Sequence, residues 1–91
     1  MISIPPGIVI VHKRHMALCY KERVLSRDEE DEMDRSIEVL RPWKRLIEEL
    51  ARLNIAETEG VTLTPFERAR QTELREFHDQ WVHNRDNWQT P

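Results

Sequence analysis

An amphipathic helical pattern through residues 26–59 constrains the fold of this chain more than any other segment. Apolar side chains recur in it at steps of three or four residues, at Met33, Ile37, Leu40, Trp43, Ile47 and Leu50. Ser26 and Glu29 have the spacing of a capping box, in which each side chain accepts a hydrogen bond from the other residue's backbone N–H. The sequence therefore predicts one long helix over residues 27–59.

Pro42 lies inside this helical pattern. A proline in a helix interior removes one backbone hydrogen bond and crowds the carbonyl four residues earlier, at a cost of about 3 kcal/mol. We expect a kink at Pro42. A break into two helices stays open as the alternative, although Arg41 would cap a second helix poorly. Gly60 can adopt the left-handed conformation that often follows a helix, which predicts the end of the helix there.

A second long helix is predicted over residues 64–87. Thr64, Pro65 and Glu67 have the types and spacing of a capped helix start. The apolar row expected along this helix contains Phe66, Leu74, Phe77, Trp81 and Trp88, with Arg70 and Asn84 at polar positions. Because only four residues separate the two long helices, we expect them to lie antiparallel as an αα-hairpin.

The residues before the long helices are harder to interpret. Pro5, Pro6 and Gly7 predict an extended arm over residues 1–12. The β-branched run at residues 8–11 favours a short strand, which would either pack on the helices or pair with the same segment of a second copy. Met16, Tyr20 and Val24, at steps of four, predict a basic helix over residues 13–25.

These elements predict a single all-α domain over residues 1–91. A chain of 91 residues builds only a small core, and one third of this chain is charged. Two long helices and one short helix would bury only part of their apolar faces. We therefore expect self-association, as a homodimer with coiled-coil-like packing, to complete a bundle.

Charge is distributed unevenly along the chain, although the net charge is only -3. Residues 12–27 carry a net charge of +4, whereas residues 28–34 carry -6. The six acids of that second segment are Asp28, Glu29, Glu30, Asp31, Glu32 and Asp34. We interpret them as a surface that attracts a basic protein. Trp88 is a further candidate contact, because tryptophan often anchors interfaces and this one is close to the chain end.

Nucleic-acid binding is the first alternative. The basic residues that could contact phosphates are Lys13, Arg14, Lys21, Arg23 and Arg27. The adjacent acids oppose this interpretation, because they would repel phosphates within a Debye length of about 8 to 10 Å. The other interpretation of the basic segment is that it matches the acidic helix start within or between chains.

Zinc binding is the second alternative. His12, His15 and Cys19 would share one face of a helix, and His78 or His83 could supply a fourth ligand. Nothing in the sequence pairs a nucleophile with a base, and two glycines are too few for a phosphate-binding loop. We therefore expect no enzymatic activity and no cofactor.

The sequence also predicts a cellular compartment and a biological role for this protein. A single cysteine permits no intrachain disulfide, which indicates a reducing, cytoplasmic setting. No run of residues approaches the length of about 20 apolar residues needed to span a bilayer, so we expect no membrane partner. The sequence thus predicts a small regulator or inhibitor that binds another protein. One hypothesis is a phage or mobile-element accessory protein that blocks a nucleic-acid-binding machine.

Overall fold

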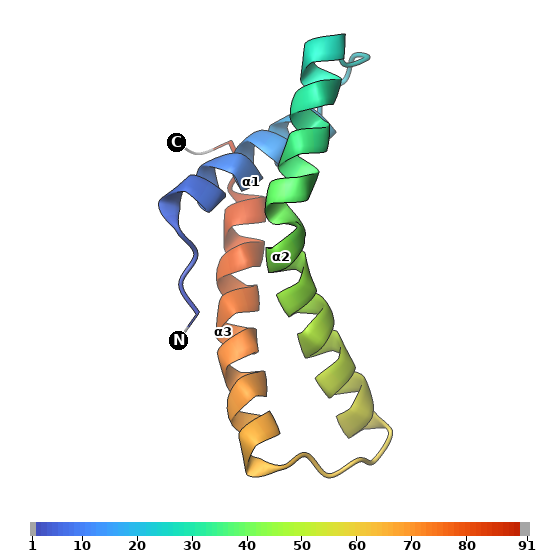
Figure 1. The fold of residues 1–91 in the computed structure, drawn as a ribbon, viewed down its shortest axis with the longest axis vertical. Helices are drawn as coiled ribbons and strands as arrows, with labels where there is room; N and C mark the ends of the chain where they lie inside the picture. Colours follow the sequence, from blue (N-terminus) through green and yellow to red (C-terminus); the bar gives the residue numbers. More distant parts are fainter. Residues whose placement is uncertain (1, 90–91) are drawn as a thin grey trace.

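The computed structural model of this chain describes residues 2–89 and contains three helices (Figure 1). They are α1 (Pro6–Cys19), α2 (Arg27–Thr58) and α3 (Pro65–Asp86). No strand is present among the described residues, so the predicted all-α class is confirmed. The molecule measures 49 × 24 × 19 Å. Its long dimension equals the length of about 48 Å that 32 helical residues span, so α2 determines the shape.

Helix α2 begins with the predicted capping box. The Ser26 hydroxyl accepts a hydrogen bond from the backbone N–H of Glu29, and the Glu29 carboxylate accepts one from the backbone N–H of Ser26. The helix continues without interruption through Pro42, so the break that the sequence left open does not occur. A bend at Pro42 stays a prediction. Gly60, just beyond the helix, has a positive φ of 89° and turns the chain toward α3.

Helix α3 starts with a second capping box and lies beside α2. Thr64 and Glu67 exchange backbone and side-chain hydrogen bonds, and Pro65 occupies the first helical position. The helix lies within one residue of the predicted range at each end. It runs back along α2 in the opposite direction (Figure 1). Between the two helices, the buried Gln71 amide donates a hydrogen bond of 3.0 Å to the Asn54 side chain.

The prediction for the N-terminal segment is wrong in three respects. The extended arm over 1–12 ends at residue 5, because α1 begins at Pro6; residue 1 lies outside the described residues. The strand at residues 8–11 is helical, and the basic helix over 13–25 begins seven residues earlier and ends at Cys19. Pro6 suits the first helical position, where its missing N–H has no partner to lose.

Packing explains why the β-branched residues of α1 are helical. Leu40, Phe77 and Trp81 form a buried cluster where the three helices meet. The residues packed around this cluster include Ile4, Ile8 and Val11 from the N-terminal segment. Burying these side chains outweighs a β preference that spans only about 1 kcal/mol per residue. No neighbouring strand exists within residues 2–89 to satisfy an extended backbone.

Four positions of the predicted apolar rows lie on the surface instead. The exposed fractions of Val24, Phe66, Tyr20 and Ile37 are 88%, 81%, 62% and 37%. Phe66 lies in the first turn of α3, one turn before the row that faces α2. Val24 follows the end of α1, so it belongs to no helix face. The real end of α1 therefore excludes Val24 from an apolar row, whereas Phe66 is exposed although it lies within α3.

Candidate functional site

The acidic cluster at the start of α2 divides into an inner and an outer group. The inner group is Glu29 and Glu32, which the basic segment neutralises. Glu29 forms ion pairs with Lys21 and, at 3.1 Å, with Arg23. The Glu32 carboxylate accepts two hydrogen bonds, of 2.8 and 3.1 Å, from the Arg14 guanidinium. These bonds lower the pKa of Glu32 and keep it charged at neutral pH.

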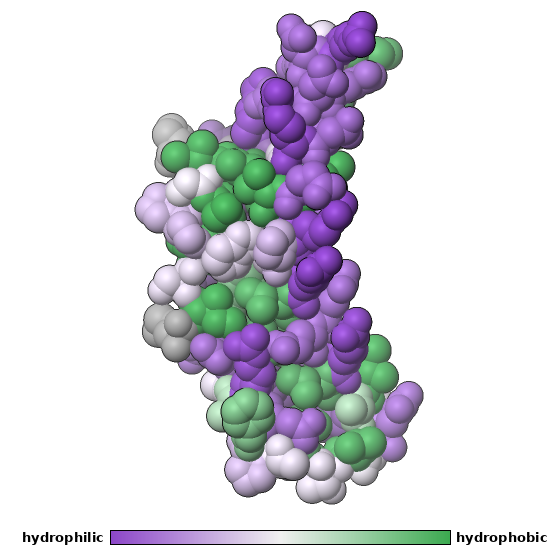
Figure 2. Space-filling view, in the orientation of Figure 1, coloured by the Kyte–Doolittle hydropathy of each residue, from purple (hydrophilic) through white to green (hydrophobic). Residues whose placement is uncertain are grey.

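The outer group forms an exposed patch that we name the acidic ridge: Asp28, Glu30, Asp31 and Asp34. All four side chains are exposed, and within residues 2–89 the structure gives none of them an ion pair or a side-chain hydrogen bond. Spacings of three and four residues make them neighbours on the helix surface. Figure 2 shows hydrophilic side chains covering this end of the molecule. The ridge therefore carries four exposed carboxylates that form no ion pair within residues 2–89.

The ion pairs of Glu29 and Glu32 involve residues that were proposed to bind nucleic acid. Of its five basic residues, Arg14, Lys21 and Arg23 are paired with Glu29 or Glu32. A phosphate backbone would have to displace these pairs while it approached the ridge. The structure contains the other predicted arrangement. In it, the basic segment forms ion pairs with the acidic start of α2 in the same chain.

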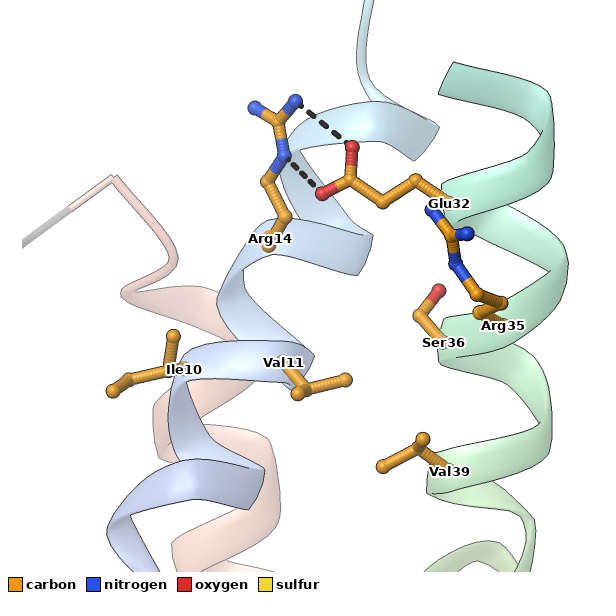
Figure 3. A pocket seen from close by; sticks show the side chains of 7 residues that line it. All are labelled: Ile10, Val11, Arg14, Glu32, Arg35, Ser36 and Val39. Atoms are coloured by element: carbon orange, nitrogen blue, oxygen red, sulfur yellow. Dashed lines mark hydrogen bonds and ion pairs between the residues drawn. The ribbon is translucent and has the colours of Figure 1, made fainter. Parts of the chain in front are cut away.

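An apolar groove lies next to the acidic ridge, between α1 and the first half of α2 (Figure 3). It has a volume of about 260 Å³ and is lined by Ile10, Val11, Arg14, Glu32, Arg35, Ser36 and Val39. The Arg14–Glu32 pair crosses one end of it, and the aliphatic side chains form the other. Small-molecule sites commonly enclose about 300 to 1,000 Å³, so the volume of this groove is below the usual range. The groove is better suited to a single side chain of a partner protein.

Sequence reasoning misses Ile10 and Val39 as groove residues because their local patterns indicate other roles. Val39 lies one step off the apolar stripe of α2, and Ile10 was assigned to a strand. Their exposed fractions are 44% and 68%. A helical interpretation of residues 6–19 would have placed Ile10 and Arg14 on one face, four residues apart. This four-residue spacing is the sequence signal that could have identified one wall of the groove.

The proposed zinc ligands are not brought together. His12 and His15 are buried, whereas the Cys19 thiol is exposed. The part of the chain that the structure describes has no group of three or more His, Cys, Asp or Glu side chains placed to hold a metal. Instead, the Nδ1 atom of His15 lies 2.8 Å from the Ser36 hydroxyl oxygen. Because the Ser36 hydroxyl donates to the Met33 carbonyl, Nδ1 of His15 must be the protonated nitrogen.

Each of the three tryptophans contacts another aromatic ring of the same chain. Trp88, the candidate anchor for a partner, stacks on Tyr20 with 5.6 Å between the ring centroids. Trp43 stacks on Phe77, and Trp81 stacks on His12 at 4.0 Å. The contact of Trp88 fastens the end of the described chain to the segment after α1. Its role toward a partner stays a prediction.

Comparison with known proteins finds no matching family model and no significantly similar curated protein or solved structure. Within residues 2–89, no helix has both the length and the apolar composition that crossing a membrane requires.

Proposed function

We propose that this protein is a non-enzymatic regulator that binds another protein through the acidic ridge and the adjacent groove. The partner would present basic side chains next to one large aliphatic side chain. The observation that supports this proposal is the difference between the two groups of acids. Glu29 and Glu32 form ion pairs, whereas the four ridge carboxylates form none within residues 2–89.

The ridge and the groove would contribute differently to binding. Exposed, unpaired carboxylates attract a basic partner over about a Debye length, which raises the association rate more than the final affinity. An aliphatic side chain that enters the groove would lose its contact with water and slow dissociation. A partner with both features would combine rapid association with a defined orientation.

Several expectations from the sequence belong to the same proposal. They are a cytoplasmic setting, the absence of a cofactor, and a role in blocking a nucleic-acid-binding machine of a phage or mobile element. A row of carboxylates on a helix can imitate the phosphates that such a machine binds, and the ridge supports this version of the role.

The test uses charge reversal at the ridge. We would replace Asp31 and Asp34 with Lys, because neither side chain has a partner in the described chain. Glu29 and Glu32 must stay, since they hold the capping box and the Arg14 pair. The matched control replaces Glu59 and Glu76 with Lys, which gives the same charge change at exposed positions far from the ridge in sequence.

The measurement has two steps. Proteins captured from the native host by the wild type and by both variants are identified by mass spectrometry. The binding kinetics of each purified candidate are then measured at several salt concentrations. We expect the ridge variant to lose the partner and the control to keep it, with an association rate that falls as salt is added. Equal binding by both variants would show that the ridge is only a solvated surface.

Self-association is a separate part of the proposal. Ile55, Val61 and Phe66 lie near the connection between α2 and α3 and are 57%, 55% and 81% exposed. A second copy that covers them would enlarge a small core. Light scattering should give the mass of a dimer for the wild type and of a monomer for the Phe66→Ser variant. A monomeric wild type at high concentration would refute this part.

A further inference from the structure

A second cleft, of about 360 Å³, lies on another face of α1 and is separate from the groove of Figure 3. Its walls come from all three helices and include His12, His15, Lys44, Ile47, Trp81 and Arg85. This volume lies within the usual range for small-molecule sites. Apolar and aromatic surface is combined here with a few convergent polar groups, which is the usual composition of a ligand site.

Among the residues that line this cleft, cations outnumber carboxylates. Lys44 has no ion pair within residues 2–89, whereas Arg85 forms an ion pair of 3.3 Å with its neighbour in sequence, Asp86. Glu48 is the single carboxylate among the lining residues. Lys44 and Arg85 therefore bring two cations from different helices to the cleft, and Lys44 in particular would attract an anion that entered it.

His12, which lines this cleft, has a buried polar atom without a partner. The residue is 3% exposed, and its ring stacks on Trp81 with 4.0 Å between centroids. Its Nδ1 atom is the only buried side-chain nitrogen or oxygen in the described residues without a hydrogen-bond partner. Such atoms are rare in folded proteins, and a bound water or ligand is a common explanation.

We propose that this cleft binds a small organic acid. Lys44 and Arg85 would hold the anionic group, and Ile47 and Trp81 would contact the apolar body. A ligand oxygen near His12 would give Nδ1 the partner that it lacks. The positive potential that would attract the acid also acts on the histidines: the pKa of His12 is lowered to about 4, chiefly by burial and further by His15, Lys44 and Arg85.

The test compares three probes by NMR of the full chain: hexanoate, its neutral analogue hexanamide, and acetate. The readouts are the ring nitrogens of His12 and the indole N–H of Trp81. We expect saturable shifts with hexanoate and at least fivefold weaker binding of the other two, because only hexanoate has both the charge and the apolar body. Saturation with hexanoate should also raise the pKa of His12, since the anion favours the protonated ring.

Two variants locate the binding site. Lys44→Gln should weaken hexanoate binding about fivefold, as expected for the loss of a partly exposed ion pair. Arg45→Gln makes the same charge change at the next position, which does not line the cleft, and should leave binding within about twofold. Circular dichroism confirms that both variants are folded. Equal binding of hexanoate and hexanamide, equal effects of the two variants, or no saturable shift at millimolar hexanoate would each overturn the proposal.

Discussion

Replacing His12 with phenylalanine should reduce the loss of stability that this protein suffers between pH 7 and pH 5. His12 is 3% exposed and its pKa is lowered from 6.5 to about 4, mainly by burial. The folded state therefore keeps the ring neutral at pH values where the unfolded chain binds a proton. Stability is fully present above pH 6.5, falls as the pH drops below 6.5, and stops falling near pH 4.

The size of this effect follows from the two pKa values. At pH 5 the unfolded His12 is almost fully protonated, whereas the folded His12 is about one tenth protonated. Linkage then gives a loss of about 2 kcal/mol between pH 7 and pH 5, and of about 3 kcal/mol in total. His15 contributes in the same direction, because burial and Lys44 lower its pKa as well.

Phenylalanine keeps the stacking on Trp81 and cannot titrate. At pH 7 the variant should be at least as stable as the wild type, because it removes the unpartnered Nδ1 atom. Urea unfolding at pH 7 and pH 5 measures the four free energies. The wild type should lose about 2 kcal/mol more than the variant, a difference on the order of 1 to 2 M in midpoint. Parallel losses in both proteins would refute the argument that burial keeps His12 neutral.

Three further changes test the packing by urea unfolding at pH 7. A double-mutant cycle with Arg14→Ala and Glu32→Ala should give a coupling of about 0.5 to 1 kcal/mol, since both side chains are substantially exposed; a coupling above about 2 kcal/mol would contradict this. Gln71→Ala should cost about 1 to 2 kcal/mol, because the Asn54 side chain loses its buried donor; unchanged stability would contradict it. Pro42→Ala should stabilise the chain by up to about 3 kcal/mol, and a loss of stability would show that the proline shapes the packing.

The two long helices were predictable because their start signals act locally. The capping boxes at Ser26 and Thr64 need only residues within three positions of each other. Helix α1 has no such signal: the structure gives Pro5, which precedes it, no capping side-chain hydrogen bond. Its β-branched residues favour a strand, and only contacts with α2 and α3 decide otherwise. A tertiary contact of this kind cannot be read from a local pattern.

The candidate site was predictable in position but not in arrangement. The sequence locates the acids at the start of α2, and it cannot tell which of them α1 and the following segment neutralise. That division depends on where Arg14 and Lys21 lie, which depends on the position of α1. The cleft at His12 was missed for the same reason, because residue 12 was placed in an extended arm.

Helix α1 therefore helps to form both the groove and the cleft. Ile10, Val11 and Arg14 form one wall of the groove, whereas His12, His15 and Met16 form one wall of the cleft. Both surfaces require α1 to stay packed on α2 and α3, while the acidic ridge belongs to α2 alone. Because the buried His12 and His15 lie at that contact and have lowered pKa values, acid weakens the packing that forms the groove and the cleft. Binding that uses either surface should therefore weaken as the pH falls below 6.5, the ordinary pKa of histidine.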